Sequence, residues 1–219
     1  MSILNSLIKT KPYAQHKVSN TTLLTSARHA AIISIGHQKR VKVFIRTFVL
    51  LYFLFCSFSE AYASPDIRLF RDAVALQKKN IKHIQQKDKI VIIDYHRSIF
   101  EKRLWVIDLK KRRILMHTEI GHAGLSGIFY ASDFSNTPDS YMSSIGSFVT
   151  TNTYKGHFGY SLNVEGLDKG VNDNAFDRRI VFHKMRGQPW SHGCFTIPRR
   201  QSRKLINLIK DGVFMYVRG

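Results

Sequence analysis

Short runs of β-branched and aromatic residues, separated by polar turns, constrain the fold of this chain most strongly. The first three runs cover residues 89–94, 104–108 and 113–118, and later runs cover residues 146–151, 160–164, 179–183 and 213–217. Runs of this length and composition are typical of strands. Because the first three follow one another through short connections, they predict a meander of antiparallel strands.

Two segments repeat apolar residues at helical spacing instead. The first spans residues 65 to about 85, with Asp66 expected in its first turn and an apolar face formed by Ile67, Phe70, Val74 and Ile81. A second helix is expected to begin at Pro198 and to end at Gly212. The sequence therefore predicts a single, mainly β domain with one N-terminal helix and one helix after Cys194.

A basic stretch followed by an apolar run indicates an export signal at about residues 40–63. The apolar run, residues 47–56, is shorter than the roughly 20 residues that a membrane anchor needs. Ala61-Tyr62-Ala63 has the small-x-small pattern of a signal-peptidase site, so cleavage would leave residues 64–219 as the mature domain. A retained anchor and a lipoprotein modified at Cys56 are the alternatives. Nearly forty residues precede the signal, which leaves open a true translation start near Val41 or Val43.

The balance of charge is strongly basic in the expected mature part as well. The whole chain has a formal net charge of +19, and residues 64–219 hold 26 of the 34 Lys and Arg and 14 of the 15 Asp and Glu, or +12. Such a domain favours anionic partners. For an exported protein these are wall polymers, lipid headgroups and carboxylate-bearing peptides, and we expect no nucleic-acid partner.

Cys194 is the cysteine that would remain after cleavage. A lone cysteine in an exported chain is a buried inert thiol, an intermolecular link or a reactive group. Here it follows Ser191, His192 and Gly193 in a polar turn, with His183 eleven residues upstream at the end of an expected strand. A nearby base can activate a thiol, and a glycine turn lets successive amide N–H groups point at a developing oxyanion. Cys194 is therefore the candidate nucleophile of acyl transfer through a thioester.

At these residues the sequence resembles the L,D-transpeptidases of the YkuD type, in particular the murein L,D-transpeptidase catalytic domain family. The similarity extends from about Lys89 to the C-terminus through Val91-Ile-Ile-Asp94, Arg103-Leu-Trp-Val-Ile-Asp108, Gly121-His122, Phe134-Ser-Asn136, Ser143-Ser-Ile-Gly146, Ser161-Leu-Asn-Val-Glu-Gly-Leu167, Asn172-Asp-Asn-Ala175 and Arg179-Ile-Val-Phe-His183. Two positions depart from the family pattern, Lys184 after the histidine and Thr196 after the cysteine. The interval between His183 and Cys194 is also shorter than usual.

The resemblance implies a β-sandwich or barrel in which Cys194 is the nucleophile and His183 its base. It assigns Ser191, His192 and Gly193 to the turn that forms the acyl pocket and the oxyanion hole, and it implies neither a cofactor nor a metal. The implied reaction takes a peptidoglycan stem tetrapeptide, releases D-alanine and passes the acyl group to an acceptor amine. The expected location is the periplasm or the cell wall, and the expected state is a monomer.

Other interpretations remain open from the sequence. The same site would be an L,D-carboxypeptidase if water replaced the amine, and the domain could be a wall-binding module without catalysis. Cys194 could be an unreactive buried thiol, or a zinc ligand together with His183, His192 or His122, although the usual zinc spacings are absent.

Three further side chains are ambiguous. His122 could line the substrate cleft or make only local hydrogen bonds, and Trp190 could belong to the pocket wall or to the core. His157 is expected in an exposed turn.

Overall fold

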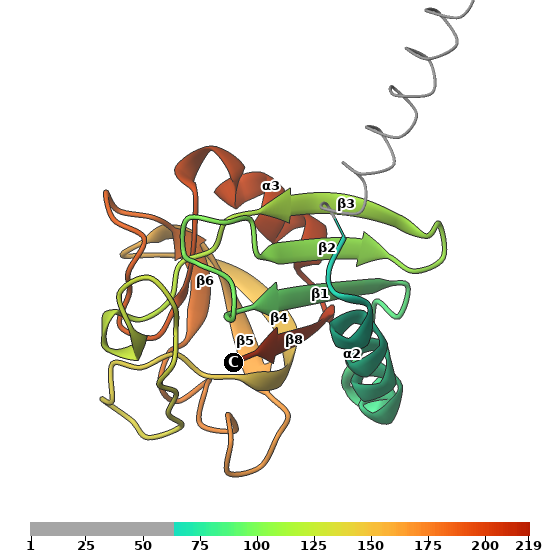
Figure 1. Ribbon diagram of the computed structural model, residues 1–219, viewed down its shortest axis with the longest axis horizontal. Coiled ribbons are helices and arrows are strands. Elements are labelled where there is room, and N and C mark those ends of the chain that lie inside the picture. Colours follow the sequence, from blue (N-terminus) through green and yellow to red (C-terminus); the bar gives the residue numbers. More distant parts are fainter. Residues whose placement is uncertain (1–63) are drawn as a thin grey trace, which may run out of the picture. The chain divides into compact units, whose positions relative to one another are not determined.

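The computed structural model describes residues 64–219, in which eight strands form one curled sheet (Figure 1). The predicted mainly β architecture is therefore confirmed. The export signal, its cleavage site after Ala63 and the alternative starts lie outside the described residues. The elements are α2 (Ile67–Lys79), η1 (Ile81–His83), β1 (Lys89–Asp94), β2 (Leu104–Asp108), β3 (Arg113–Thr118), η2 (Gly124–Ser126), β4 (Gly146–Gly156), β5 (Gly159–Gly166), β6 (Val181–Lys184), β7 (Phe195–Ile197), α3 (Arg199–Ile209) and β8 (Phe214–Arg218).

The strands follow the order β3-β2-β1-β8-β4-β5-β6-β7 across the sheet. β1, β2 and β3 form the predicted antiparallel meander. The C-terminal strand β8 lies parallel to β1 and antiparallel to β4, so it joins the meander to the second half of the sheet. At the far edge, β7 lies parallel to β6.

The strands at the centre of the sheet are buried on both faces, and alternate residues enter different cores. Ile90 and Ile92 of β1 pack with Phe214 of β8 on the face that α2 covers. Val91 and Ile93 pack on the opposite face, where α3 contributes Leu205, Ile206 and Ile209. This alternation follows from the two-residue repeat of a strand. It explains why β1 is an uninterrupted apolar run in the sequence.

α2 begins two residues after the predicted start at Pro65 and ends at Lys79, short of the predicted end near residue 85, whereas α3 begins one residue after Pro198. Asp66 was expected in the first turn of α2, but it caps the helix, and its Oδ1 accepts hydrogen bonds from the amides of Arg68 and Leu69 at 3.0 and 3.1 Å. Pro198 likewise stands just before α3, which begins at Arg199. Both residues have extended backbone angles that suit a cap position. Within residues 64–219, neither helix has the length and apolar character needed to cross a membrane.

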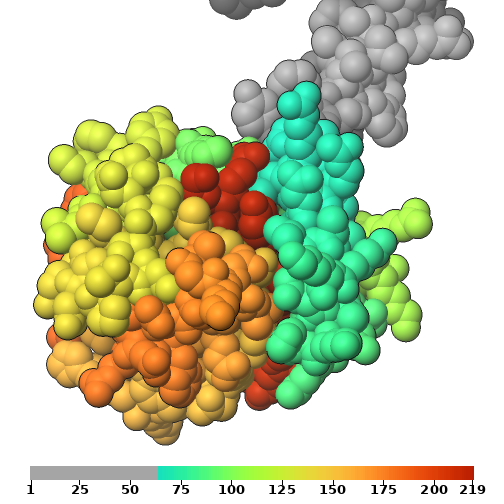
Figure 2. All heavy atoms as spheres, turned by 90° about the horizontal axis from the view of Figure 1, so that it is seen from below, coloured from blue at the N-terminus to red at the C-terminus, as the bar shows by residue number. Residues whose placement is uncertain are grey.

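Two long connections lie side by side on one surface of the domain (Figure 2). The first joins β3 to β4 and the second joins β5 to β6. Asn136 of the first donates to the Asp173 carboxylate at 2.7 Å, and it accepts from the Asn174 amide at 3.0 Å. The two connections therefore form one continuous wall beside the edge of the sheet that carries β6 and β7.

Candidate active site

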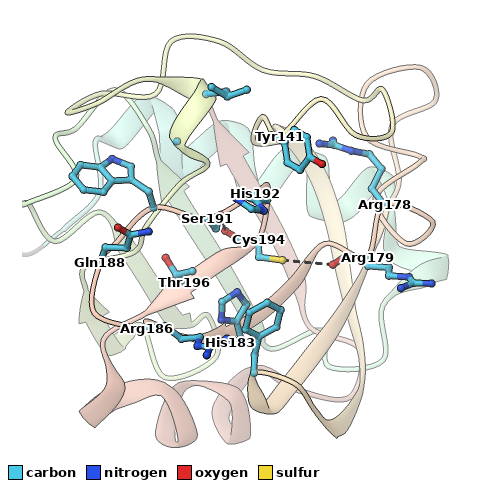
Figure 3. Close-up of a pocket in the computed structure, with 14 residues that line it drawn as sticks. Tyr141, Arg178, Arg179, His183, Arg186, Gln188, Ser191, His192, Cys194 and Thr196 are labelled. Atoms are coloured by element: carbon cyan, nitrogen blue, oxygen red, sulfur yellow. Dashed lines mark hydrogen bonds between the residues drawn. The ribbon is translucent and has the colours of Figure 1, made fainter.

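Two adjacent parallel strands bring the predicted nucleophile and base together. His183 lies on β6, and its pairing partner on β7 is Thr196, two residues after Cys194. Cys194 therefore ends the turn that enters β7, next to the strand that carries His183. Both side chains line one cleft of about 830 Å³, where Figure 3 shows His183 near Cys194 and the thiol directed at the carbonyl oxygen of Arg179.

His183 is almost fully buried, and its hydrogen bond fixes the tautomer. Nδ1 lies 2.9 Å from the carbonyl oxygen of Lys184, which can only accept, so Nδ1 carries the proton and Nε2 is left with a lone pair. The ring stacks on Phe158 with centroids 4.1 Å apart. Burial lowers the pKa of His183, and the nearby charge of Arg186 acts in the same direction. At neutral pH the imidazole is therefore an uncharged proton acceptor.

Cys194 is a free, half-buried thiol. Its Sγ donates to the carbonyl oxygen of Arg179 at 3.5 Å. Burial raises the pKa of the Cys194 thiol, whereas the Val181 amide and the Arg178 guanidinium favour the thiolate. Since burial is the larger effect, the resting pair is a neutral thiol with a neutral imidazole.

The turn before Cys194 is closed by its own hydrogen bonds. The Ser191 hydroxyl donates to the Cys194 carbonyl at 2.7 Å and accepts from the Gly193 amide at 3.2 Å. Gly193 has a φ of +126°, and a Cβ there would lie 2.6 Å from Cδ1 of Ile180. The unusual backbone angle expected at Gly193 is thus present, and this positive φ favours glycine. His192 is exposed and meets Tyr141 edge to face, with ring centroids 4.9 Å apart.

Backbone hydrogen bonds with Gly121 and His122 hold this turn and the start of β7 in place. The Ser191 amide donates to the His122 carbonyl at 2.9 Å, and the Gly121 amide donates to the Thr196 carbonyl at 2.8 Å. A Cβ on Gly121 would collide with the carbonyl oxygen of Pro189 and with the Thr196 hydroxyl. Residues 121–124 therefore run in direct contact with the catalytic turn, which explains a glycine at position 121.

His122 makes only local contacts. Its side chain is fully buried, with Nδ1 2.7 Å from Nη2 of Arg103 and Nε2 2.8 Å from the Gly127 carbonyl. Arg103 can only donate, so Nε2 carries the proton and the ring is neutral. Burial lowers the pKa of His122 to about 4. Of the two roles left open for His122, the structure supports the local one.

Arg178 ties the first long connection to the site. Its guanidinium donates to the Met142 carbonyl at 2.7 Å, to the Ser140 hydroxyl at 3.0 Å and to the Ser144 hydroxyl at 2.6 Å, and it also donates to the Ser135 carbonyl. Tyr141, the neighbour of two of these partners, lines the cleft. Arg178 thus determines where this connection lies relative to Cys194.

The structure also shows where Trp190 and His157 lie. Trp190 lines it and donates from Nε1 to the Ile128 carbonyl at 3.0 Å, so it belongs to the pocket wall. His157 is exposed, as expected, and accepts from Nη1 of Arg186 at 2.8 Å. No group of three or more His, Cys, Asp or Glu side chains within residues 64–219 is arranged to hold a metal ion.

Sequence reasoning missed several residues that line the cleft. Phe158 and Arg186 surround His183, while Arg178 and Tyr141 surround Cys194. None of them belongs to the short motif around Cys194. The arginine pair at 178 and 179, directly before β6, was the one available signal, because it ends a connection that is otherwise rich in Asp and Asn.

Comparisons with known proteins show the family of this chain. Residues 63–217 match the family described as the L,D-transpeptidase catalytic domain. No protein with a curated description matches the chain.

Solved structures of similar proteins are distant in sequence. An L,D-transpeptidase from Stackebrandtia nassauensis is 19% identical over 67% of this chain and 65% of its own, with a TM-score of 0.39. An L,D-transpeptidase from Mycobacterium smegmatis is 10% identical over 60% of this chain and 59% of its own, with a TM-score of 0.38. The helical cell shape determining protein Pgp2 from Campylobacter jejuni is 14% identical over 59% of this chain and 46% of its own, with a TM-score of 0.43. The chain thus spans less than two thirds of each of these structures.

Proposed function

This chain belongs to the L,D-transpeptidase catalytic domain family, and from that premise we propose that it transfers peptidoglycan stem peptides through a thioester at Cys194. The donor is a stem tetrapeptide, the leaving group is its terminal D-alanine, and an amine accepts the acyl group. The observation that carries this proposal is the neutral pair in the cleft. His183 has an unprotonated Nε2, and the thiol of Cys194 enters the same cleft from the neighbouring strand.

The first half of the reaction uses this pair as base and nucleophile. Nε2 of His183 takes the thiol proton while Sγ of Cys194 forms a bond to the carbonyl carbon of the third residue. The carbonyl oxygen becomes an oxyanion. The bond to the D-alanine nitrogen then breaks, and His183 returns the proton to that nitrogen. D-alanine leaves, and the acyl group remains on sulfur.

The second half repeats these steps with the acceptor amine in place of the thiol. His183 takes a proton from the amine as its nitrogen attacks the thioester carbon. The carbon–sulfur bond then breaks, and the thiolate of Cys194 is reprotonated. A neutral imidazole suits both halves, because each half begins with a proton transfer to it.

We assign the oxyanion site to the turn of Ser191, His192, Gly193 and Cys194. The Ser191 hydroxyl and the positive φ of Gly193 hold this turn in one conformation. Preorganised amides of this kind are worth roughly 10²–10³ in rate in acyl transfer. The Gly193 amide already donates to Ser191, so the Cys194 amide is our preferred donor.

The test supplies a purified disaccharide-tetrapeptide as both donor and acceptor and follows the products by mass. Cross-linked dimer with stoichiometric D-alanine supports transfer. Cys194→Ser and Cys194→Ala serve as controls, and neither should form an acyl-enzyme. If the wild-type protein releases no D-alanine, the proposal is wrong.

Hydrolysis is the second candidate, and one observation favours it. Cys194 is partly exposed, and only ten residues separate β6 from β7, so water could reach a thioester there. Tripeptide as the sole product, even with abundant acceptor, would identify an L,D-carboxypeptidase.

The substrate lies outside the cytoplasm, so we also propose that the chain is exported to the periplasm or the cell wall. The basic and apolar pattern of residues 40–63 supports this proposal.

A further inference from the structure

A second hollow of about 620 Å³ is lined by cationic side chains. It is bounded by Lys184, Met185, Arg186, Gly187 and Arg199, and no acidic residue lines it. Among the ion pairs of residues 64–219, none includes Lys184, Arg186 or Arg199. Three cationic groups therefore surround one hollow without a carboxylate to balance them.

The start of α3 adds to this positive potential. Arg199 and Arg200 are the first two residues of this eleven-residue helix, and its first turn contains no acidic residue. A helix N-terminus already carries about half a unit of positive charge, so arginine is unfavourable there. The fold thus concentrates positive charge at a place where an anion would relieve the repulsion.

Arg186 connects this hollow to the catalytic cleft, because it lines both. Its guanidinium donates to His157 at 2.8 Å and lies 5.9 Å from the centroid of Phe158, the ring that stacks on His183. Figure 3 accordingly shows Arg186 beside His183 at the edge of the cleft. A ligand held in the hollow would therefore lie next to the catalytic base.

We propose that this hollow is a subsite for the carboxylates of the acyl acceptor, an inference that rests on the proposed transfer reaction. The donor acyl group occupies the cleft at Cys194, so the acceptor must approach from an adjoining surface. A stem peptide offers carboxylates together with an amine. Held by Lys184, Arg186 and Arg199, such a peptide would present its amine toward the thioester beside His183. The short connection between β6 and β7 leaves this approach open.

The experiment separates acceptor binding from donor chemistry. The donor is a disaccharide-tetrapeptide at a fixed concentration. The varied acceptor is a disaccharide-tripeptide with a free side-chain amine at its third residue, which cannot be a donor because it lacks the terminal D-alanine. Arg199→Gln is compared with Arg200→Gln, the neighbouring residue with the same charge change, which does not line the hollow.

We expect Arg199→Gln to raise the acceptor KM roughly fivefold, since a partly exposed charge pair contributes modestly. Arg200→Gln should change this KM much less, because Arg200 does not line the hollow, and the effect of Arg199→Gln should shrink as salt is added. An acceptor whose carboxylates are amidated should bind wild type and Arg199→Gln equally well. Lys184→Gln, made on β6 and not on α3, should reproduce the rise if Arg199→Gln fails to fold.

The outcomes distinguish the subsite from the reaction. Equal acceptor KM values for Arg199→Gln, Lys184→Gln and Arg200→Gln, with cross-linking intact in the wild type, would overturn the subsite alone. A rise in the donor KM with no change for the acceptor would assign the hollow to the donor and would also overturn it. Release of D-alanine without cross-linked product would contradict both transfer and an acceptor site, and no release at all would contradict the proposed function.

Discussion

At the scale of single residues, the environment keeps both reacting groups neutral. Burial raises the pKa of the Cys194 thiol and lowers the pKa of the His183 imidazole. In the proposed reaction the thiolate therefore forms as His183 receives the proton, without a preformed ion pair. Arg178 opposes the effect of burial, because its positive charge favours the thiolate.

Replacement of Arg178 by methionine should therefore slow alkylation of Cys194. The loss of a positive charge disfavours the thiolate, so the pKa of the thiol rises further and the pH midpoint of alkylation by iodoacetamide moves upward. At pH 8 the rate should fall on the order of threefold to tenfold. Mass spectrometry of the labelled protein gives the rate at each pH. Arg200→Met removes the same charge from an exposed site and should leave the profile in place. A pH midpoint that stays or moves downward in Arg178→Met would show that the charge of Arg178 does not lower the pKa of the Cys194 thiol.

The two histidines near Cys194 should differ in their contribution to turnover. His183→Ala removes the proposed base, which is typically worth roughly 10²–10⁴ in rate. His192→Ala removes an exposed ring whose contact is with Tyr141, so a smaller loss is expected. Release of D-alanine under single-turnover conditions measures both variants. Equal or reversed losses would mean that the roles of the two histidines are exchanged.

The short motif predicted which residues form the turn, but it could not predict what surrounds them. Cys194 and His183 are close in sequence, so their spacing was enough to predict that they lie in one site. Phe158 and Arg178 reach the site from the β4–β5 hairpin and from the connection before β6, and their roles depend on tertiary packing. A single sequence offers no local pattern for such contacts.

At the scale of elements, the composition of the β-rich runs predicted where strands lie in the sequence but not which strands pair in the sheet. The three strands of the meander lie where the sequence predicts them, because each is a complete β-rich run between polar turns. β7 was missed, since three residues are too few for a recognisable pattern. The parallel position of β8 beside β1 was not predicted either, because it brings together runs more than 120 residues apart.

An ion pair joins these two distant strands at their ends. Asp94 is almost fully buried, and its carboxylate accepts from Nε of Arg218 at 3.0 Å and from Nη2 at 2.6 Å. The Asp94 carboxylate also accepts from the His96 amide at 3.2 Å. This bidentate geometry is the strong form of a charged hydrogen bond.

Asp94→Asn should therefore destabilise the domain by about 2 kcal/mol, because it leaves Arg218 without its charged partner at the β1–β8 junction. Urea denaturation of the variant gives the change in the free energy of unfolding. Asp211→Asn is the matched control. It removes an exposed pair with Lys210 at 3.3 Å and should cost less than about 0.5 kcal/mol. Similar values for the two variants would show that the buried pair contributes no more than a surface pair.

At the scale of the whole molecule, the described residues 64–219 form two apolar cores, one on each face of the sheet, and a cleft at the edge that carries β6 and β7. The same range carries the net charge of +12, which suits the anionic partners that we propose for it.

The proposed cleavage after Ala63 should release a folded and reactive domain. Only Ser64 and Pro65 would precede Asp66, whose side chain caps α2 and whose carboxylate lies 4.0 Å from Nη1 of Arg218. Cleavage at this point keeps the cap, whereas cleavage a few residues later would remove it and would free the amides at the start of α2. N-terminal sequencing of the exported protein should therefore read Ser64 first.

A purified chain of residues 64–219 should melt cooperatively and form an acyl-enzyme with a carbapenem, as its family membership leads us to expect. A chain that begins at Ile67 provides the comparison and should melt at a lower temperature. Recovery of a protein that keeps residues 47–56 in the membrane would contradict the cleavage. Equal melting temperatures for the chains that begin at Ser64 and at Ile67 would contradict the role of Asp66.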